Sequence, residues 1–134
     1  MKALMRRIFL LVVIFLSGCA WVTYEEFQSQ TPSNVMTVKS NAKCVFEAFN
    51  IEAMKTQPNL SVYAPLSWAG SYNEKNKEGL VIGSIPRRGY AVSINIKEVS
   101  ESNTMVEGRF KDLLTDNEGL VNKIFSSVDL TGCH

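Results

Sequence analysis

An uninterrupted apolar run near the start of the chain most constrains what it can fold into. Ile8 to Leu16 are nine consecutive apolar residues, and three basic residues and no acidic ones precede them. A helix of this length spans about 14 Å, whereas roughly 20 residues are needed to cross the hydrocarbon core of a bilayer. A basic segment followed by a short apolar run is typical of a secretory signal peptide. We therefore expect residues 1–18 to be removed and the fold to be built from residues 19–134.

The residues that follow this run resemble the bacterial lipobox. Leu16-Ser17-Gly18-Cys19 places small residues directly before a cysteine. In lipobox proteins a peptidase cuts before the cysteine, whose sulfur carries a diacylglycerol, and further acylation makes the attachment stable because one acyl chain binds a bilayer only reversibly. The resemblance implies that Cys19 is a membrane anchor and not a nucleophile. A secretory signal with a chance cysteine, or an uncleaved anchor, is the alternative.

Ala20 bears on the destination of such a lipoprotein. In this class an aspartate after the cysteine commonly holds the protein at the inner membrane. Since alanine stands there, the resemblance implies the outer membrane of a Gram-negative envelope, facing the periplasm.

The charge and residue inventory disfavours several classes of function. Three of the 14 basic residues and none of the 13 acidic residues lie in residues 1–18, which leaves a formal charge of −2 for residues 19–134. A nucleic-acid-binding face is therefore not expected. The one histidine, His134, and three cysteines leave little material for a metal site or a histidine-based triad. We expect no cofactor, no metal and no enzymatic activity.

Apolar periodicity predicts two helices. The first runs from Asn41 to about Lys55 with Ser40 as its N-cap, because apolar residues recur there at three- and four-residue spacing. The second begins with the capping-box pattern Thr115-Asp116-Asn117-Glu118 and ends near Gly132. Its apolar stripe consists of Leu120, Val121, Ile124, Phe125 and Val128.

Alternation of apolar and polar residues predicts several strands. The clearest is Tyr90–Val99, where every second residue from Val92 to Ile96 is apolar. The other expected strands are Val35–Lys39, Leu60–Leu66, Gly79–Ile85 and Thr104–Lys111. The polar stretch Gly70–Glu78 is expected to be an exposed connection. The pattern predicts the α+β class, with an antiparallel β-meander of three to five strands and two helices packed on one face.

Residues 19–34 precede these elements and are expected to be a lipidated tether. No sustained period is present there, and a flexible chain of about 14 residues has an end-to-end distance near 20 Å. Trp21, Tyr24 and Phe27 either sit at the membrane interface or pack on the domain, and the sequence leaves both open. Residues 35–134 are expected to form a single domain.

Cysteine usage predicts one disulfide. Cys44 lies on the apolar face of the first predicted helix, and Cys133 follows the second. Export places both in an oxidising compartment, and they are the remaining pair once Cys19 is lipidated. We expect a Cys44–Cys133 disulfide that links the two helices. Two unpaired thiols, with Cys44 as a small core residue, are the alternative.

The whole pattern resembles a group of small, mostly uncharacterised bacterial lipoproteins with a two-cysteine α+β periplasmic domain. The matching residues are Leu16 to Cys19, Ser40 to Cys44, Gly89-Tyr90 to Ile96, and Cys133. The lipobox is the specific part of this resemblance. The group implies a fold and a location, but no activity.

Two groups of residues are candidates for binding. Arg87 and Arg88 lie on a predicted hairpin turn, where two guanidinium groups suit a carboxylate or a phosphate. A solvated turn that protects a sheet edge is the simpler interpretation. Tyr63, Trp68 and Tyr72 are expected to form an aromatic patch on the exposed side of the sheet, with a core position for Trp68 as the alternative.

These observations favour a non-enzymatic envelope lipoprotein that binds a protein or glycan component of the envelope. The alternative is a periplasmic inhibitor or immunity-type protein that blocks a hydrolase by inserting the Gly70–Glu78 connection. A hydrolase is least expected, because it needs a pocket that converges on Glu98, Glu101 or Arg87. The carboxylate pairs of the chain are better explained as solvated surface charges than as catalytic groups.

Overall fold

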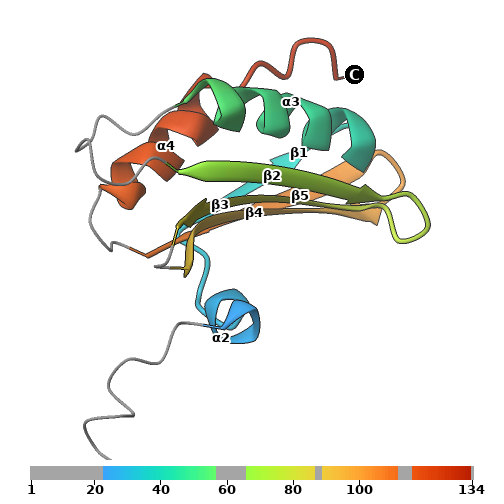
Figure 1. Cartoon of the computed structure of the whole chain (residues 1–134). Coiled ribbons are helices and arrows are strands. Elements are labelled where there is room, and N and C mark those ends of the chain that lie inside the picture. Colours follow the sequence, from blue (N-terminus) through green and yellow to red (C-terminus); the bar gives the residue numbers. More distant parts are fainter. Residues whose placement is uncertain (1–22, 57–65, 87–88, 112–115, 134) are drawn as a thin grey trace, which may run out of the picture.

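The computed structural model of the protein describes residues 23–56, 66–86, 89–111 and 116–133. Its elements are α2 (Tyr24–Gln28), β1 (Asn34–Val38), α3 (Ala42–Lys55), β2 (Ser67–Asn73), β3 (Glu78–Ile85), β4 (Gly89–Ser100), β5 (Asn103–Phe110) and α4 (Asn117–Ser127). Figure 1 shows one sheet with α3 and α4 on one side and α2 on the other. The α+β class predicted from the sequence is confirmed.

The sheet has five antiparallel strands in the order β1-β5-β4-β3-β2. Strands β2 to β5 form a meander, and β1, which precedes α3 in the chain, pairs with β5 at the far edge. The strands expected over 35–39, 79–85, 90–99 and 104–111 correspond to β1, β3, β4 and β5 to within one residue at each end. Alternation located them because it reflects burial: every second residue from Gly79 to Ile85 is buried.

The fifth strand, β2, lies where the sequence predicts a polar connection. Gly70–Glu78 is exposed as expected, apart from the half-buried Tyr72, but it is not a connection throughout: Ser67–Asn73 pairs with β3, and only Glu74 to Lys77 form the turn. An edge strand with one solvated face needs few apolar residues, which is why its composition resembles that of a loop. The strand expected over Leu60–Leu66 lies outside the described residues except for Leu66, which is not in a strand.

Helices α3 and α4 contact each other and one side of the sheet, called here the covered face (Figure 1). The Phe49 ring of α3 lies 5.1 Å from the Phe125 ring of α4, between centroids. Glycines bring the helices close to the strands: a Cβ at Gly79 would lie 2.7 Å from Phe46, and one at Gly108 would lie 2.7 Å from Phe125. Side chains from both helices and from β3, β4 and β5 therefore share one core.

The N-cap of α3 is Asn41 and not the expected Ser40. The Asn41 side-chain oxygen accepts a hydrogen bond from the Cys44 N–H at 2.9 Å. Ser40 is buried, and its carbonyl accepts a hydrogen bond from the Thr104 hydroxyl at 2.7 Å. Because Ser40 is fixed in the turn between β1 and α3, the next residue, Asn41, caps the helix.

The second predicted helix is shorter than expected. Asp116 caps α4 by accepting from the Gly119 N–H at 2.9 Å, while Thr115 lies outside the described residues. The helix ends at Ser127 and not near Gly132. The predicted apolar stripe is confirmed as buried for Leu120, Val121, Ile124 and Phe125, and Val128 packs partly buried against the core.

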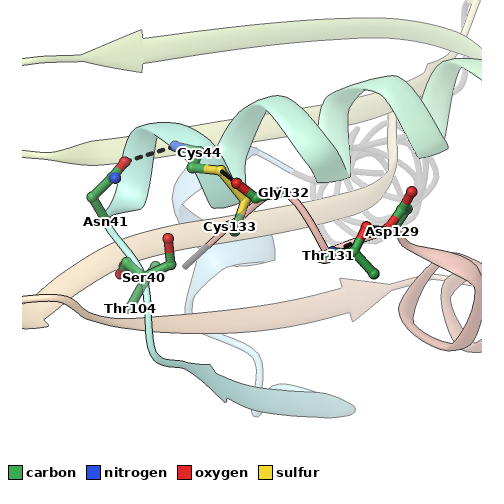
Figure 2. Close-up of a disulfide and its surroundings, with 8 residues drawn as sticks. All are labelled: Ser40, Asn41, Cys44, Thr104, Asp129, Thr131, Gly132 and Cys133. Atoms are coloured by element: carbon green, nitrogen blue, oxygen red, sulfur yellow. Dashed lines mark hydrogen bonds between the residues drawn. A yellow bond between two sulfur atoms is a disulfide. The ribbon is translucent and has the colours of Figure 1, made fainter.

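Cys44 and Cys133 form the expected disulfide across a sequence separation of 89 residues (Figure 2). Cys133 lies beyond the end of α4, so the bridge joins α3 to the segment that follows α4 and not one helix directly to the other. A hydrogen-bonded turn shapes this segment: the Thr131 hydroxyl and N–H donate to the Asp129 carboxylate at 2.6 and 3.0 Å. These two hydrogen bonds lower the pKa of Asp129.

The described part of the expected tether packs on the sheet. Tyr24–Gln28 is the helix α2, and Phe27 is fully buried. Tyr24 and Phe27 are three residues apart, so they share one face of the helix, and both rings meet Tyr90 of β4 at 5.7 and 6.4 Å between centroids. Of the two interpretations left open for these aromatic residues, packing on the domain is confirmed for Phe27, while Tyr24 contacts Tyr90 and stays 38% exposed. Trp21 lies outside the described residues.

Candidate functional site

The side of the sheet away from α3 and α4, called here the open face, carries the candidate site. Side chains alternate along a strand, and Gly108 faces Phe125 on the covered face, so Glu107 and Arg109 must face the open side. The same alternation, carried through the register of the sheet, places Leu80 and Asn95 on the open face. Only α2 lies over this face among the described elements (Figure 1).

A bulge in the sheet directs Tyr90 towards α2. The register between β3 and β4 shifts at Gly83 and Ser84, so that Gly83 faces Val92 while Ser84 faces Tyr90. At this point β4 therefore has one residue more than β3. In a regular strand Tyr90 and Val92 would point to the same side, because they are two residues apart. The bulge thus gives the open face an aromatic ring on which α2 packs.

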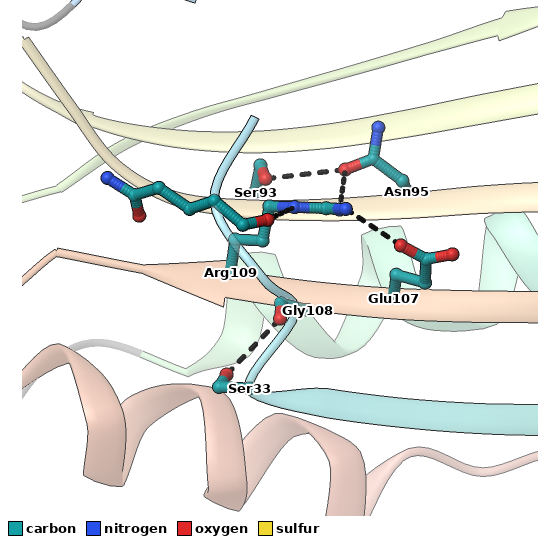
Figure 3. A network of polar contacts seen from close by, with 7 residues as sticks. Ser33, Ser93, Asn95, Glu107, Gly108 and Arg109 are labelled. Atoms are coloured by element: carbon teal, nitrogen blue, oxygen red, sulfur yellow. Dashed lines mark hydrogen bonds and ion pairs between the residues drawn. The ribbon is translucent and has the colours of Figure 1, made fainter. Parts of the chain in front are cut away.

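Arg109 holds the chain after α2 against the open face (Figure 3). Its Nε donates to the Gln30 carbonyl at 2.8 Å, and its Nη2 donates to the Glu107 carboxylate at 2.8 Å. Its Nη1 lies 3.4 Å from the Asn95 side-chain oxygen, to which the Ser93 hydroxyl also donates at 3.3 Å. With only 11% of its side chain exposed, Arg109 is chiefly a structural clamp.

A groove of about 580 Å³ lies on the open face beside α2. This open-face groove is lined by side chains from α2, β2, β3, β4 and β5, including Gln28, Ser71, Leu80, Asn95, Lys97 and Met105. The Gln28 side-chain nitrogen is buried without a hydrogen-bond partner. A pocket that combines apolar floor residues with a few polar groups is typical of a binding site.

The charges of the open-face groove are balanced. Among the described residues, two cations and two anions line it, and they form the pairs Lys97–Glu78 at 3.4 Å and Arg109–Glu107 at 2.8 Å. The first pair is accessible, because Lys97 and Glu78 keep 60% and 46% of their side chains exposed. The groove can therefore offer one donor and one acceptor of opposite charge, side by side, to a ligand.

Trp68 and Tyr72 do not form the expected patch on the exposed side of the sheet. Trp68 faces Gly83 and Tyr72 faces Gly79 in the register of β2 and β3, and both glycines face the covered side. The Tyr72 ring stacks on Phe46 at 5.6 Å between centroids. The Trp68 ring fills the space that Gly83 leaves, whereas Phe46 occupies the space above Gly79. Tyr63, like the proposed binding residues Arg87 and Arg88, lies outside the described residues.

The remaining candidates do not converge on one centre. Glu98 pairs with Lys77 at 3.2 Å, and Glu101 is exposed in the turn after β4. No group of three or more potential metal ligands occurs in the described ranges. The lipidation candidate Cys19 and the terminal His134 lie outside those ranges.

Alternation along 104–111 puts Arg109 on the side of its strand opposite Val106 and Phe110, which agrees with the structure, but it does not identify the groove. The alternation over 104–111 is the only signal in the sequence for this position. The contact with Gln30 joins residues 79 apart, and the groove needs α2 to be docked. Neither follows from a local pattern.

The fold and the groove define a small α+β domain with one covered and one open sheet face. No protein-family model matches the chain, and no curated protein matches its sequence. No helix within the described residues is long and apolar enough to cross a membrane.

Proposed function

We propose that the protein is a non-enzymatic lipoprotein of the bacterial cell envelope, anchored by lipid at Cys19, that binds another envelope component through the open-face groove. The observation that carries the binding role is the groove itself: a volume of about 580 Å³ on the open face, with polar, charged and apolar lining. A cavity of this size suits a small ligand or part of a larger one. The anchoring role rests on the resemblance of residues 16–19 to the lipobox.

The disulfide is consistent with a location outside the cytoplasm, because such bridges persist in oxidising compartments. We further propose that it keeps α4 beside α3, since it fixes the segment after α4 to the first turn of α3. In this role the bridge holds the helical layer on the covered face, and the open face stays free for binding.

The inhibitor alternative is motivated by a long connection over Gly70–Glu78. In that alternative an exposed connection over 70–78 inserts into a hydrolase, but residues 70–73 belong to β2, 74–77 form a short turn, and Glu78 begins β3. The envelope-binding role is therefore the better supported one.

Intact mass of the protein purified from membranes tests the anchor. We expect cleavage before Cys19, an added acyl mass on that residue, and no thiol labelling of Cys44 or Cys133 until reduction. Retention of residues 1–18, or an unmodified Cys19, would contradict the lipoprotein proposal.

A photo-crosslinking residue at Leu80, inside the groove, tests the binding role in intact cells. We expect an adduct from this position and none from the same residue at Ser126, which is exposed on α4 away from the groove. Equal adducts from the two positions, or none from Leu80, would contradict binding at the open face.

A further inference from the structure

The place where the chain leaves the domain fixes which side of the domain can meet the membrane. Helix α2 is docked, since Phe27 is fully buried, its ring lies 6.4 Å from Tyr90, and the Gln30 carbonyl is held by Arg109 at 2.8 Å. The first described residue, Thr23, caps this helix by accepting from the Glu26 N–H at 3.2 Å. The point of departure is thus part of the open face and not the start of a loose tether.

Little chain remains between this point and the proposed anchor. Four residue steps separate Thr23 from Cys19. Even a fully extended chain covers only about 14 Å in four steps. A lipid-anchored Cys19 therefore keeps Thr23 close to the headgroup layer, and α2 forms one wall of the open-face groove through Tyr24 and Gln28.

The chemistry of the groove indicates which membrane group it suits. Lys97 and Glu78 lie on neighbouring strands with their charged atoms 3.4 Å apart, and both remain substantially exposed. A phosphate next to an ammonium group can pair with both, the phosphate with Lys97 and the ammonium with Glu78. Two cations and two anions leave the groove without net charge, so a zwitterionic headgroup suits it better than an anionic one.

We propose that the open face lies against the bilayer that holds the Cys19 anchor, and that the open-face groove takes the headgroup of a zwitterionic phospholipid. The exposed side chain of Val35 lies on the same face, because its partner Glu107 faces that side. This inference rests on the proposed lipidation of Cys19. It names phospholipid as the envelope component that the groove binds.

Site-specific fluorescence on the full lipidated protein tests the orientation. A fluorophore is attached to Ser71→Cys, on the groove, or to Ser126→Cys, on the outer surface of α4. The protein is then placed in phosphatidylcholine vesicles that contain headgroup nitroxide lipid. We expect loss of most of the Ser71→Cys fluorescence and little loss at Ser126→Cys. Equal quenching at the two sites overturns the proposed orientation.

A longer anchor separates headgroup binding from simple tethering. An insertion of about 20 Gly/Ser residues between Cys19 and Thr23 lets the domain move away from the bilayer. We expect quenching at Ser71→Cys to persist in this variant, and to be lost when Lys97→Glu places two carboxylates side by side. The matched control, Lys123→Glu on exposed α4, should keep the quenching. Loss of quenching with the long anchor alone overturns headgroup binding.

The mass of the same samples distinguishes failure of this inference from failure of the lipoprotein proposal. Acylated protein with equal quenching at both sites overturns this inference and leaves the lipoprotein proposal standing. Protein without an acyl group overturns both, because the orientation depends on the anchor at Cys19.

Discussion

Tyr72 is partly buried, and its charged neighbours are the carboxylates Glu98 and Glu74 and the lysines Lys43 and Lys77. Its ring stacks on Phe46, and burial, followed by the negative charges of Glu98 and Glu74, raises the pKa of Tyr72 above its usual value of 10.0. The folded state thus favours the neutral phenol. A raised pKa means that the unfolded chain loses this proton first, so the associated stability is present below pH 10 and is lost as the pH rises through the higher value of the folded state.

We therefore predict that the protein loses more stability between about pH 8 and about pH 11 than the Tyr72→Phe variant does. The substitution keeps the ring that stacks on Phe46 and removes only the ionisable hydroxyl. Urea denaturation of both proteins at the two pH values measures the difference, and the titration of lysines, common to both proteins, cancels. An equal loss in the two proteins would show that the phenol is not shielded.

The orientation of Tyr72 and Trp68 shows a limit of sequence reasoning at the residue scale. Both residues alternate with small residues in β2, which gives no hint of the face they occupy. Their face is decided by the register with β3, where Gly79 and Gly83 stand opposite them. The register depends on how the strands pair. Which residues stand opposite a glycine is therefore known only once the pairing is known.

At the scale of elements, the two candidate caps of α3 offer a direct comparison. Asn41→Ala removes the acceptor for the Cys44 N–H, and we expect it to lower the free energy of unfolding by about 1 kcal/mol. Ser40→Ala removes a buried hydroxyl that has no hydrogen-bond partner, so we expect little change or a slight gain. Chemical denaturation of both variants measures this order. A larger loss for Ser40→Ala would favour the cap expected from the sequence.

The elements that local patterns predict well are those whose apolar residues alternate in the sequence or recur at helical spacing. These are β1, β3, β4, β5 and the two long helices. Helix α2 has only five residues, too few to be stable through its own hydrogen bonds. It forms because Tyr90 receives Tyr24 and Phe27, and Tyr90 faces α2 because of the bulge in β4. No local pattern in the sequence predicts this series of long-range contacts.

At the scale of the whole molecule, the groove exists because the two faces of the sheet are covered unequally. The covered face receives two helices and the shared core. Among the described elements, the open face receives only α2, held at one end by Phe27 and Arg109. The sequence predicts the covered face through its apolar stripes. It does not predict the groove, because the groove depends on where a short segment docks.

The disulfide ties the segment after α4 to α3. Cys133 lies beyond α4, and the bridge to Cys44 closes a loop with a sequence separation of 89 residues. In the chain-entropy model such a loop contributes roughly 4–5 kcal/mol by restricting the unfolded chain, and measured values are often smaller. Net stabilities of domains are typically about 5–15 kcal/mol, so this contribution is a large share.

We predict that the double substitution Cys44→Ser/Cys133→Ser lowers the free energy of unfolding of residues 19–134 by about 3 kcal/mol. Replacing both residues avoids an unpaired thiol, and Ser126→Ala, on the exposed surface of α4, is the matched control that should change little. Urea denaturation measures the loss. Hydrogen exchange then locates it: if the bridge keeps α4 beside α3, the amides of α4 should lose protection before those of β4, which lies at the centre of the sheet. Unchanged exchange in α4 would mean that packing around Phe49 and Phe125 holds the two helices together without the covalent link.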